Sequence, residues 1–368
     1  MYNGKTIVIL SPAFPANEAD SVWVPSKQLF VKMLQRQNPQ SRIIVLAFNY
    51  PHHTHTYQWH GATVIPFAMM PHSKLQRWRR WAKVWFTLQQ LHRQHTIAGI
   101  ISFWCGECAL IGSYFGKWKH IPHRCWVSGQ DARAGNYLVK WIRPQPEELV
   151  PISDFLVDEF EKHHAIRPRY MVPIGIDPEA FPSMPAKRDI DILGAGSLIP
   201  LKRYDLFIHL IKNLSCTFPH IKAVICGGGA EYDALQQLIQ SLQLQQHITL
   251  LGEQSHATVL QLMHRSKILL HTSSYEGFGN VLLESLYAGC RVASFVQPVY
   301  QKVTNWHIAT DETHMQDILH QLLQQTPAIY ERVLVYRMED NVKAFMRLLL
   351  QQPPAPVPPP APVQEYNG

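Results

Sequence analysis

The chain has 368 residues, of which 46% are hydrophobic and 17% charged. This composition is typical of a globular protein, and the length allows two domains with complete cores. The sequence contains no apolar run of membrane-spanning length, no signal-peptide pattern and no secreted disulfide framework among its six scattered cysteines, so we expect a cytoplasmic protein. The net charge of +7 favours an anionic partner, such as a nucleotide diphosphate, an anionic lipid or a nucleic acid.

The first half of the chain alternates strand-like and helical segments. Apolar runs of strand length are Lys5–Leu10, Arg42–Phe48, Thr63–Pro66, Ile97–Phe103 and His123–Val127. Helical patterns such as Pro25–Gln35 lie between them. This alternation predicts a first α/β domain, residues 1–172, built on a doubly wound parallel sheet.

A basic stretch with interleaved aromatic residues runs from Lys74 to Trp85. Its apolar residues recur at helical spacing. Two interpretations stay open. One is a helix that packs on the first sheet with its Arg and Lys side chains in solvent. The other is an interfacial patch, Arg77–Trp85, that binds an anionic membrane with Trp at the headgroup level. No recognised nucleic-acid module accompanies the stretch, so we expect no nucleic-acid partner.

Two segments that follow first-domain strands could carry chemistry. Cys105 and Cys108 have the spacing of a thioredoxin turn. The flanking α/β pattern favours small side chains in the first turn of a packed helix over a redox pair. The segment Ser128–Arg133 should lie at the ligand-binding edge of the sheet. Within it Asp131 is a candidate catalytic residue that contacts acceptor or sugar, or else a capping residue.

A proline-bearing linker, residues 173–188, precedes a second alternating block. Its predicted strands are Ile190–Gly194, Lys222–Cys226, His247–Leu251, Lys267–His271 and Arg291–Ser294. The block predicts a second doubly wound domain, residues 189–336, and a ligand cleft between the two domains. A C-terminal helix is expected within residues 337–352. The proline-rich residues 353–368 predict a disordered tail.

Two glycine loops follow strands of the second domain. The loop Gly194–Arg203 half-matches a dinucleotide fingerprint, but Ile199 stands at the third glycine position. The run Gly227–Gly229 either lets backbone approach a ligand or forms a plain tight turn. The segment Asp189-Ile190-Asp191 has the D-x-D pattern of a metal-binding carboxylate pair, but it opens a buried strand. We therefore expect no metal.

The most informative run is Ser274–Glu284, which places a glycine loop between a strand and a helix. The helix is predicted over Val281–Ala288, with Gly289 at its C-terminal cap. Strand, glycine loop and helix follow one another where parallel sheets bind ligands. The N–H groups of Gly279, Asn280 and Val281 would therefore point toward an anion such as a phosphate.

Glu276 and Glu284 flank that phosphate position. At 1.5 Å per residue, Glu284 lies about 6 Å further along the helix. That is roughly the reach from a diphosphate to the ribose of the same nucleotide, and a carboxylate can accept both hydrogen bonds of a ribose diol. Glu276 precedes the helix, where a sugar attached to the phosphate would lie. The two carboxylates predict recognition of a nucleotide sugar rather than an acid/base pair.

The Glu-Gly-Phe-Gly run followed by a second Glu resembles the E-x7-E signature of retaining glycosyltransferase family four. The GT-B fold of that family has two Rossmann-like domains facing a central cleft. The resemblance covers most of the second domain and matches the first only in layout. It implies that Glu276 contacts the donor sugar, that the loop holds the diphosphate and that Glu284 holds the ribose. The loop residues are Gly277, Phe278, Gly279, Asn280 and Val281.

The resemblance assigns further roles. Lys202 would neutralise the diphosphate of the donor and of the leaving group, and the base would lie near Gly252 and Glu253. The last helix would cross back onto the first domain. Members usually carry Arg where Ser197 stands, and Arg203 is our candidate for that missing charge.

A second departure lies in the first domain. Related enzymes often have His-Gly-x-Asp where this chain has Ser128-Gly129-Gln130-Asp131. Both departures leave open a non-catalytic GT-B-like protein that binds nucleotide sugars. An epimerase, a phosphorylase and an NAD-type oxidoreductase using Gly194–Ser197 are also open.

The resemblance favours a retaining, metal-independent glycosyltransferase without a cofactor. It would move a sugar from a nucleotide-sugar donor to a glycan or lipid-linked acceptor in polysaccharide or glycolipid synthesis. The expected catalytic residues are Glu276, Lys202 and Asp131. The family mechanism is a front-face displacement in which the leaving diphosphate takes the acceptor proton. If Arg77–Trp85 binds lipid, the enzyme would be peripheral on the cytoplasmic membrane face.

Overall fold

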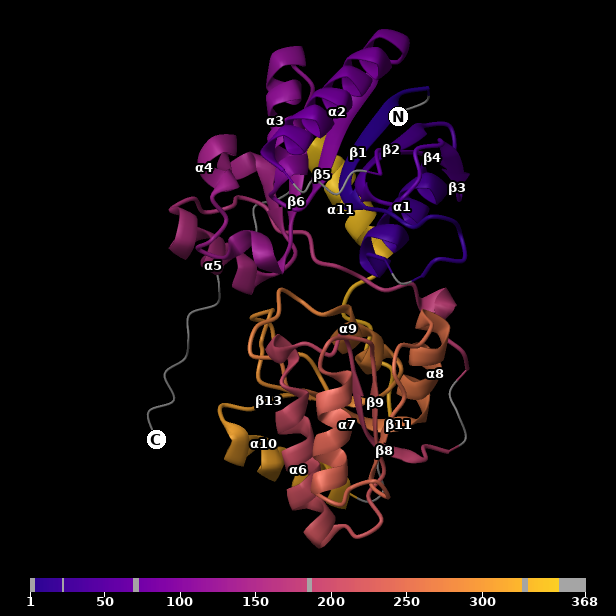
Figure 1. Cartoon of the computed structure of the whole chain (residues 1–368), viewed down its shortest axis with the longest axis vertical. Coiled ribbons are helices and arrows are strands. Elements are labelled where there is room, and N and C mark those ends of the chain that lie inside the picture. The colour runs from indigo at the N-terminus through magenta and orange to yellow at the C-terminus, as the bar shows by residue number, and fades with distance from the viewer. Residues whose placement is uncertain (1–3, 22, 69–72, 184–186, 326–329, 351–368) are drawn as a thin grey trace. The chain divides into compact units, whose positions relative to one another are not determined.

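The computed structural model describes residues 4–21, 23–68, 73–183, 187–325 and 330–350. It divides into two compact units, shown in Figure 1. The first comprises residues 1–173 together with 338–368, and the second comprises residues 174–337. Residues 174–188, expected to be a linker, thus fall within the second unit. The predicted proline-rich tail, residues 353–368, lies outside the described residues.

The first unit is built on a seven-stranded sheet with the order β3-β4-β2-β1-β5-β6-β7. Its strands are β1 (Thr6–Ala13), β2 (Arg42–Tyr50), β3 (Tyr57–Trp59), β4 (Ala62–Pro66), β5 (Ile97–Phe103), β6 (His123–Val127) and β7 (Leu149–Pro151). Every pair is parallel except β3 with β4. The central strands are largely apolar because helices cover both faces of a parallel sheet, and Ile7–Leu10 of β1 are fully buried.

The α-helices among the described residues of the first unit are α1 (Pro25–Gln37), α2 (Lys74–Gln94), α3 (Glu107–Lys119), α4 (Leu138–Ile142), α5 (Asp154–His164) and α11 (Met338–Leu349). The predicted basic helix is therefore longer than its basic stretch. Its N-cap is Ser73, whose hydroxyl accepts a hydrogen bond from the Gln76 N–H.

Helix α11 comes from the end of the chain and packs within the first unit. In Figure 1 this yellow helix lies among the indigo and purple elements. A Cβ atom at Gly99 of β5 would come within 2.6 Å of the Leu349 side chain, so only glycine leaves room for the helix. Asn341 also donates a hydrogen bond to the Pro173 carbonyl at 2.9 Å. Packing on β5 and this hydrogen bond hold α11 on the first unit.

The second unit is built on a six-stranded parallel sheet with the order β10-β9-β8-β11-β12-β13. Its strands are β8 (Ile190–Ala195), β9 (Ala223–Cys226), β10 (Ile248–Leu250), β11 (Ser266–His271), β12 (Arg291–Ser294) and β13 (Trp306–Ile308). Its helices are α6 (Tyr204–Thr217), α7 (Tyr232–Ser241), α8 (His256–Arg265), α9 (Asn280–Tyr287) and α10 (Glu312–Gln324).

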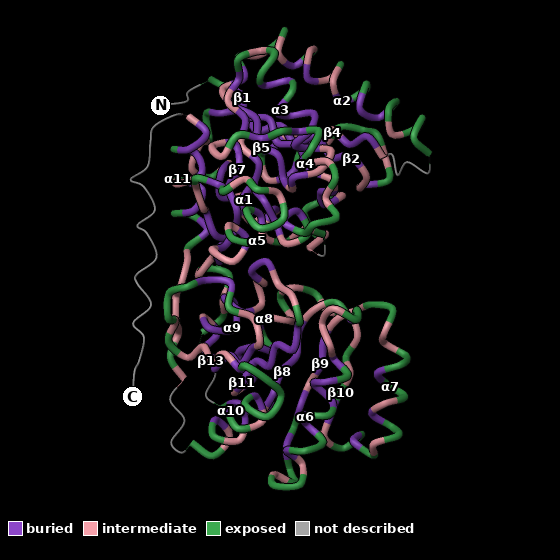
Figure 2. The backbone as a smooth tube through the Cα atoms, turned by 90° about the vertical axis from the view of Figure 1, so that its left-hand side faces the viewer, coloured by how far each residue is buried: buried purple, intermediate pink, exposed green. Residues whose placement is uncertain are grey.

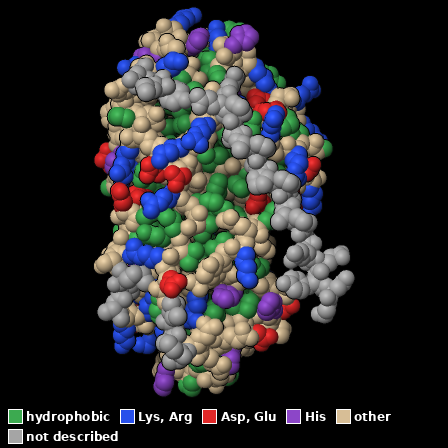
Figure 3. Space-filling model, turned by 180° about the vertical axis from the view of Figure 1, so that it is seen from behind, with side chains coloured by type: hydrophobic (Ala, Val, Ile, Leu, Met, Phe, Trp, Pro, Cys, Tyr) green, Lys and Arg blue, Asp and Glu red, His purple; other side chains and the backbone are tan. Residues whose placement is uncertain are grey.

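Burial follows the layered architecture. Figure 2 shows the strands of each sheet mostly buried, whereas exposed residues mark the outer sides of the helices. In the second unit, apolar side chains on each face of the sheet form a separate core cluster. On the surface seen from behind in Figure 3, Asp and Glu lie beside Lys and Arg at several places. The positive net charge is thus not gathered into one stripe on that surface.

Arg188 anchors the segment before β8 to the rest of the second unit. Its side chain is buried, and its guanidinium donates to the carbonyl oxygens of Met263 at 3.1 Å, Ala288 at 2.5 Å and Ser266. These carbonyls belong to α8, to β11 and to the C-terminal end of α9. One buried cation therefore satisfies three backbone acceptors at the base of the sheet.

We expect Arg188→Met to destabilise the second unit by about 2–4 kcal/mol, because three buried carbonyl groups lose a charged donor. Urea unfolding measured by circular dichroism would report the change. Arg79→Met, at an exposed position of α2, is the matched control. Identical unfolding midpoints for the two variants would contradict the role of Arg188.

Candidate functional site

The main cluster of charged side chains lies where the strand order of the second sheet reverses. The neighbours β8 and β11 are parallel, and the chain leaves β8 toward β9 on one side and β11 toward β12 on the other. The loops after β8 and β11 therefore meet at the carboxyl edge of the sheet. Thr272 Oγ1 donates to the Lys202 carbonyl at 2.8 Å, and the Ser274 N–H donates to the Leu201 carbonyl at 3.1 Å. These bonds hold the two loops together.

Lys202 and Glu276 form an ion pair across these loops. The Lys202 ammonium donates to Glu276 Oε2, and both side chains are 18% exposed. His271, the last residue of β11, is buried and lies 3.6 Å from the same carboxylate oxygen. The sequence predicted roles for Lys202 and Glu276 separately, and the structure brings them into direct contact.

The surroundings of Glu276 keep its carboxylate charged. Burial alone would raise the pKa of Glu276, but His271 and Lys202 outweigh burial and lower that pKa to about 2. Burial lowers the pKa of His271. At neutral pH the cluster therefore holds a carboxylate and a neutral imidazole beside Lys202.

Glu276 also lies against the N-terminus of α9. The helix begins at Asn280, and Gly279 is its N-cap with a φ of 78°. A Cβ atom at Gly279 would come within 3.1 Å of Glu276 Cγ, so glycine allows this close approach. The first N–H groups of a helix have no acceptor within the helix, and those of Asn280 and Val281 are in this position. The Phe278 side chain is fully buried, which leaves only its backbone for a ligand.

Glu284 has a partner that the sequence did not suggest. Its carboxylate is mostly buried on α9 and lies 2.8 Å from Nε2 of His256, the first residue of α8. Hydrogen bonding to Glu284 raises the pKa of His256. Without a ligand, the carboxylate predicted to bind ribose is therefore held by an imidazole.

The glycine run Gly227–Gly229 joins neighbouring loops. A Cβ atom at Gly227 would come within 1.8 Å of the Gly196 carbonyl oxygen, and one at Gly229 within 2.3 Å of the Leu198 oxygen. The Gly227 N–H donates to the Gly252 carbonyl at 2.8 Å. These glycines allow the loops after β8, β9 and β10 to pack closely. From the sequence alone, this packing role could not be distinguished from direct contact with a ligand.

Glu253 lies beside the same run. A Cβ atom at Gly228 would come within 2.9 Å of Glu253 Oε2. The two residues predicted near the base, Gly252 and Glu253, are thus packed against the β9 loop.

Other charged candidates of the second unit have different partners. Arg203 donates to Glu312 of α10 at 2.8 Å, so its guanidinium is engaged away from the Lys202–Glu276 pair. Asp189 pairs with Arg265, and Asp191 pairs with Lys267 at 2.7 Å. These two carboxylates stand at the start of β8, at the edge of the sheet opposite the glycine loops. The D-x-D pattern is therefore a pair of structural salt bridges.

Asp131 lies in the first unit and acts as a cap. Its buried carboxylate accepts the Ser128 N–H at 2.7 Å, as the open alternative of a capping residue anticipates. Burial raises the pKa of Asp131 to about 7, although hydrogen bonds from the backbone of Ser128 and Cys105 oppose that shift.

Both cysteines of the Cys-x-x-Cys segment are buried free thiols. Burial raises the pKa of Cys108 well above its ordinary value. This environment does not favour a reactive thiolate.

Sequence reasoning missed His271 and His256. A signal was present for His271, since a histidine ends an otherwise apolar strand five residues before Glu276. His256 follows Ser255, whose hydroxyl caps α8. Its contact with Glu284 depends on the packing of α8 against α9, which no local pattern shows.

Among the described residues, no three His, Cys, Asp or Glu side chains gather into a group that could hold a metal ion. Of the helices described, none is long and apolar enough to cross a membrane.

Comparison with known proteins adds independent information. Residues 177–310 match the family model of glycosyl transferases group 1. The chain is 32% identical over 203 residues to the phosphatidylinositol N-acetylglucosaminyltransferase gpi3 subunit of Schizosaccharomyces pombe, covering 53% of this chain and 44% of the relative. It is 24% identical over 147 residues to the UDP-N-acetylglucosamine–peptide N-acetylglucosaminyltransferase GtfA subunit of Streptococcus pneumoniae, covering 40% and 29%. The chain thus spans less than half the length of either relative.

Solved structures agree on the fold. HepE of Anabaena, in complex with UDP and glucose, superposes with a TM-score of 0.63 at 15% identity, covering 95% of this chain and 98% of that one. That likeness covers both sheets and shows the GT-B fold for the described residues. The resemblance seen in the sequence is confirmed for residues 177–310, which match glycosyl transferases group 1.

Proposed function

We propose that this protein is a glycosyltransferase that binds a nucleotide-sugar donor in its second unit. The observation that carries the proposal is the contact between Lys202 and Glu276 at the N-terminus of α9. A cation and free helix N–H groups suit a diphosphate, while a carboxylate beside them suits sugar hydroxyls. Glu284, further along α9, suits the ribose. Relatives that are named as N-acetylglucosaminyltransferases support N-acetylglucosamine as the sugar to test first.

The proposed reaction is transfer with retention. The acceptor hydroxyl forms a bond to the anomeric carbon while the bond from that carbon to the diphosphate oxygen breaks. The acceptor proton passes to the leaving diphosphate. Lys202 and the first N–H groups of α9 would stabilise the charge that develops on the diphosphate. Glu276, charged at neutral pH, would orient the sugar rather than act as an acid.

We also propose that the acceptor is lipid-linked and that the first unit contacts an anionic membrane. The Schizosaccharomyces pombe relative is named for a phosphatidylinositol acceptor. In this chain an aromatic face is formed by five side chains that are each about half exposed, Trp78, Tyr114, Trp118, Tyr137 and Trp141. Aromatic side chains at this exposure suit the headgroup region of a bilayer.

Contacts between helices connect Tyr114, Tyr137 and Trp141 of this face and join Trp118 to α2. Trp85 of α2 stacks on Trp118 of α3, with ring centroids 5.5 Å apart. The Tyr114 hydroxyl donates to the Trp141 carbonyl at 3.0 Å, and Arg77 donates to the Tyr137 hydroxyl at 3.1 Å. The face therefore extends beyond the Arg77–Trp85 stretch to α3 and α4.

Charge on these helices complements an anionic surface. Helices α2 and α4 contain no Asp or Glu. Helix α3 contains only Glu107, which is already paired with Arg77 and Arg80. Arg77, Arg80 and Lys117 are paired with carboxylates, whereas the other Lys and Arg side chains of these helices would be attracted to anionic lipid.

Glu276→Ala should abolish sugar transfer while nucleotide binding survives, and Glu284→Ala should weaken nucleotide binding. The two carboxylates would contact different parts of the donor, the sugar and the ribose. Release of UDP from UDP-N-acetylglucosamine and calorimetric titration with UDP measure the two effects. Asp317→Ala, which removes a carboxylate at an exposed position of α10, is the control and should change neither measurement. Full turnover by the Glu276→Ala protein would rule out the assignment, and a donor panel that produces neither binding nor UDP release would rule out the function.

Nucleotide-sugar binding should weaken as the pH falls from 8 to 6. Hydrogen bonding to Glu284 raises the pKa of His256 above the ordinary histidine value, so a falling pH adds a proton to His256 and strengthens its hold on Glu284 against the ribose. The diphosphate of a nucleotide sugar does not titrate there, so UDP-N-acetylglucosamine is a suitable probe. Calorimetric titration should give a smaller pH dependence for His256→Asn than for the parent. Equal pH dependence in the two proteins would show that this pair does not control binding.

Membrane binding should depend on the aromatic face. The double change Trp118→Ala and Trp141→Ala should reduce sedimentation with phosphatidylglycerol-containing vesicles, because two interfacial anchors are lost. Binding of the parent should also fall with added salt. Tyr300→Ala, which removes an aromatic residue of the second unit that is 48% exposed, is the control. Undiminished binding of the double variant, or equal binding of the parent to neutral vesicles, would refute the membrane contact.

A further inference from the structure

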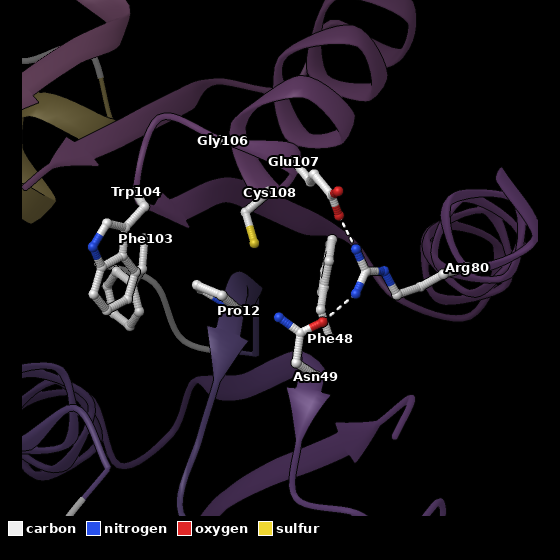
Figure 4. A pocket seen from close by; sticks show the side chains of 9 residues that line it. All are labelled: Pro12, Phe48, Asn49, Arg80, Phe103, Trp104, Gly106, Glu107 and Cys108. Carbon is white, nitrogen blue, oxygen red and sulfur yellow. Dashed lines mark hydrogen bonds and ion pairs between the residues drawn. The ribbon is translucent and has the colours of Figure 1, made fainter. Parts of the chain in front are cut away.

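A pocket of about 270 Å³ lies within the first unit and has no part in the donor site proposed above. Its lining residues come from the ends of β1, β2 and β5, from the first turn of α3 and from α2, as Figure 4 shows. The neighbours β1 and β5 are the strands at which the order of this sheet reverses. Parallel α/β sheets bind ligands outside the carboxyl ends of such strands. The pocket therefore lies where sheets of this kind bind ligands.

One wall of the pocket is polar and ordered. Arg80, on α2, is 2% exposed, and its guanidinium donates both to Asn49 Oδ1 and to Glu107. Figure 4 shows these two interactions side by side. Arg80 and Glu107 are the charged residues among those that line the pocket, so their charges balance. The wall therefore offers donors and acceptors for hydroxyl groups without a net charge that would favour an anion.

The remaining lining is apolar. Phe48 and Phe103 are buried beneath the pocket, and Pro12 and Trp104 complete that side. In Figure 4, Trp104 lies on the side opposite Arg80, and the Cys108 thiol points into the space between them. Because burial raises the pKa of Cys108, its thiol stays protonated and offers no nucleophile. Aromatic surface on one side and hydrogen-bonding groups on the other suit a ring with apolar faces and hydroxylated edges.

Trp104 is held in an unfavourable backbone conformation. Its φ is 68°, in the left-handed region that costs a side-chain-bearing residue about 1–2 kcal/mol. Neighbouring groups fix this turn. The Trp104 N–H donates to the Trp126 carbonyl at 3.2 Å, and Asn136 Nδ2 donates to the Cys105 carbonyl at 2.9 Å. Asp131 accepts the N–H of Cys105. A strained residue that is fixed so firmly at the edge of a pocket indicates that the position of its indole matters.

We propose that this pocket binds one neutral hydroxylated ring, a pyranose or a cyclitol, as the accepting residue of the acceptor. Trp104 provides the apolar platform, and Asn49, Arg80 and Glu107 bind the hydroxyl groups. Because the volume is below the usual range for drug-sized ligands, it suits a single ring rather than an oligosaccharide. Asp131 is a positioning residue for this pocket, since it holds the turn that carries Trp104. The acceptor role rests on the proposed glycosyl transfer, whereas binding of the ring does not.

The test follows the indole N–H signal of Trp104 in protein labelled with 15N-tryptophan. Trp104→Phe identifies that signal. Methyl α-glucopyranoside and myo-inositol are the neutral probes, and inorganic phosphate is the anionic one. The Trp104 signal should shift with at least one neutral probe and not with phosphate. Asn49→Ala removes one hydrogen-bonding group from the wall and should weaken binding about fivefold. Asn213→Ala, at an exposed position of α6, should leave binding unchanged.

A Trp104 signal that moves with neither neutral probe would overturn the proposal, as would a shift caused by phosphate alone. Unchanged binding by Asn49→Ala would overturn the assigned wall. UDP binding and UDP release without acceptor should be normal in Asn49→Ala, which separates the pocket from the donor site. If the ring binds but no nucleotide sugar does, the glycosyl-transfer proposal fails and the ring-binding pocket stands. If UDP release is normal and the ring does not bind, the pocket assignment alone fails.

Discussion

The contact between Lys202 and Glu276 joins the two loops on which the proposed chemistry depends. It forms because β8 and β11 lie side by side although the residues are 74 positions apart in the chain. Each charge is largely removed from water, so each needs the other in the absence of a ligand. The same arrangement recurs at Glu284, which His256 holds. Both carboxylates of the candidate donor site are therefore held by side chains of neighbouring elements, and a bound nucleotide sugar would compete with these partners.

Much of the fold could be predicted from the sequence because its strands are buried on both faces. Long apolar runs such as Ile97–Phe103 and Lys267–His271 fell within a residue of the observed strands. The strands β3 and β13 have only three residues each and contain polar side chains, so no local pattern marked them. The boundary at residue 173 depends on which sheet a segment packs against. Tertiary contacts decide that, and local composition does not.

The candidate site was predictable to a smaller extent. The spacing of Glu276 and Glu284 around a glycine loop was visible because it lies within one strand–loop–helix unit. Their partners His271 and His256 were not predicted. His256 comes from a different helix, and the burial that makes His271 a neutral neighbour is a property of the whole sheet. Asp131 carried two possible roles in the sequence, and its buried contact with the Ser128 N–H makes it a cap. Arg203 was assigned by proximity to Lys202 in sequence, but its left-handed backbone precedes α6 and its side chain reaches α10.

The close approach at Gly227 limits how this protein could acquire a new donor preference. With the Gly196 oxygen 1.8 Å from where a Cβ would lie, no side chain can be accommodated at Gly227 unless the loops separate. Gly227 contacts the loop after β8 through Gly196 and the loop after β10 through Gly252. A side chain at Gly227 would therefore displace the Lys202 loop and the Gly252 segment together. Evolution or engineering would have more freedom at Glu253, whose side chain lies at the margin of these loops. A change in specificity at this site would therefore come from the side chains around these loops, because the close packing at Gly227 and Gly229 leaves no room for larger residues.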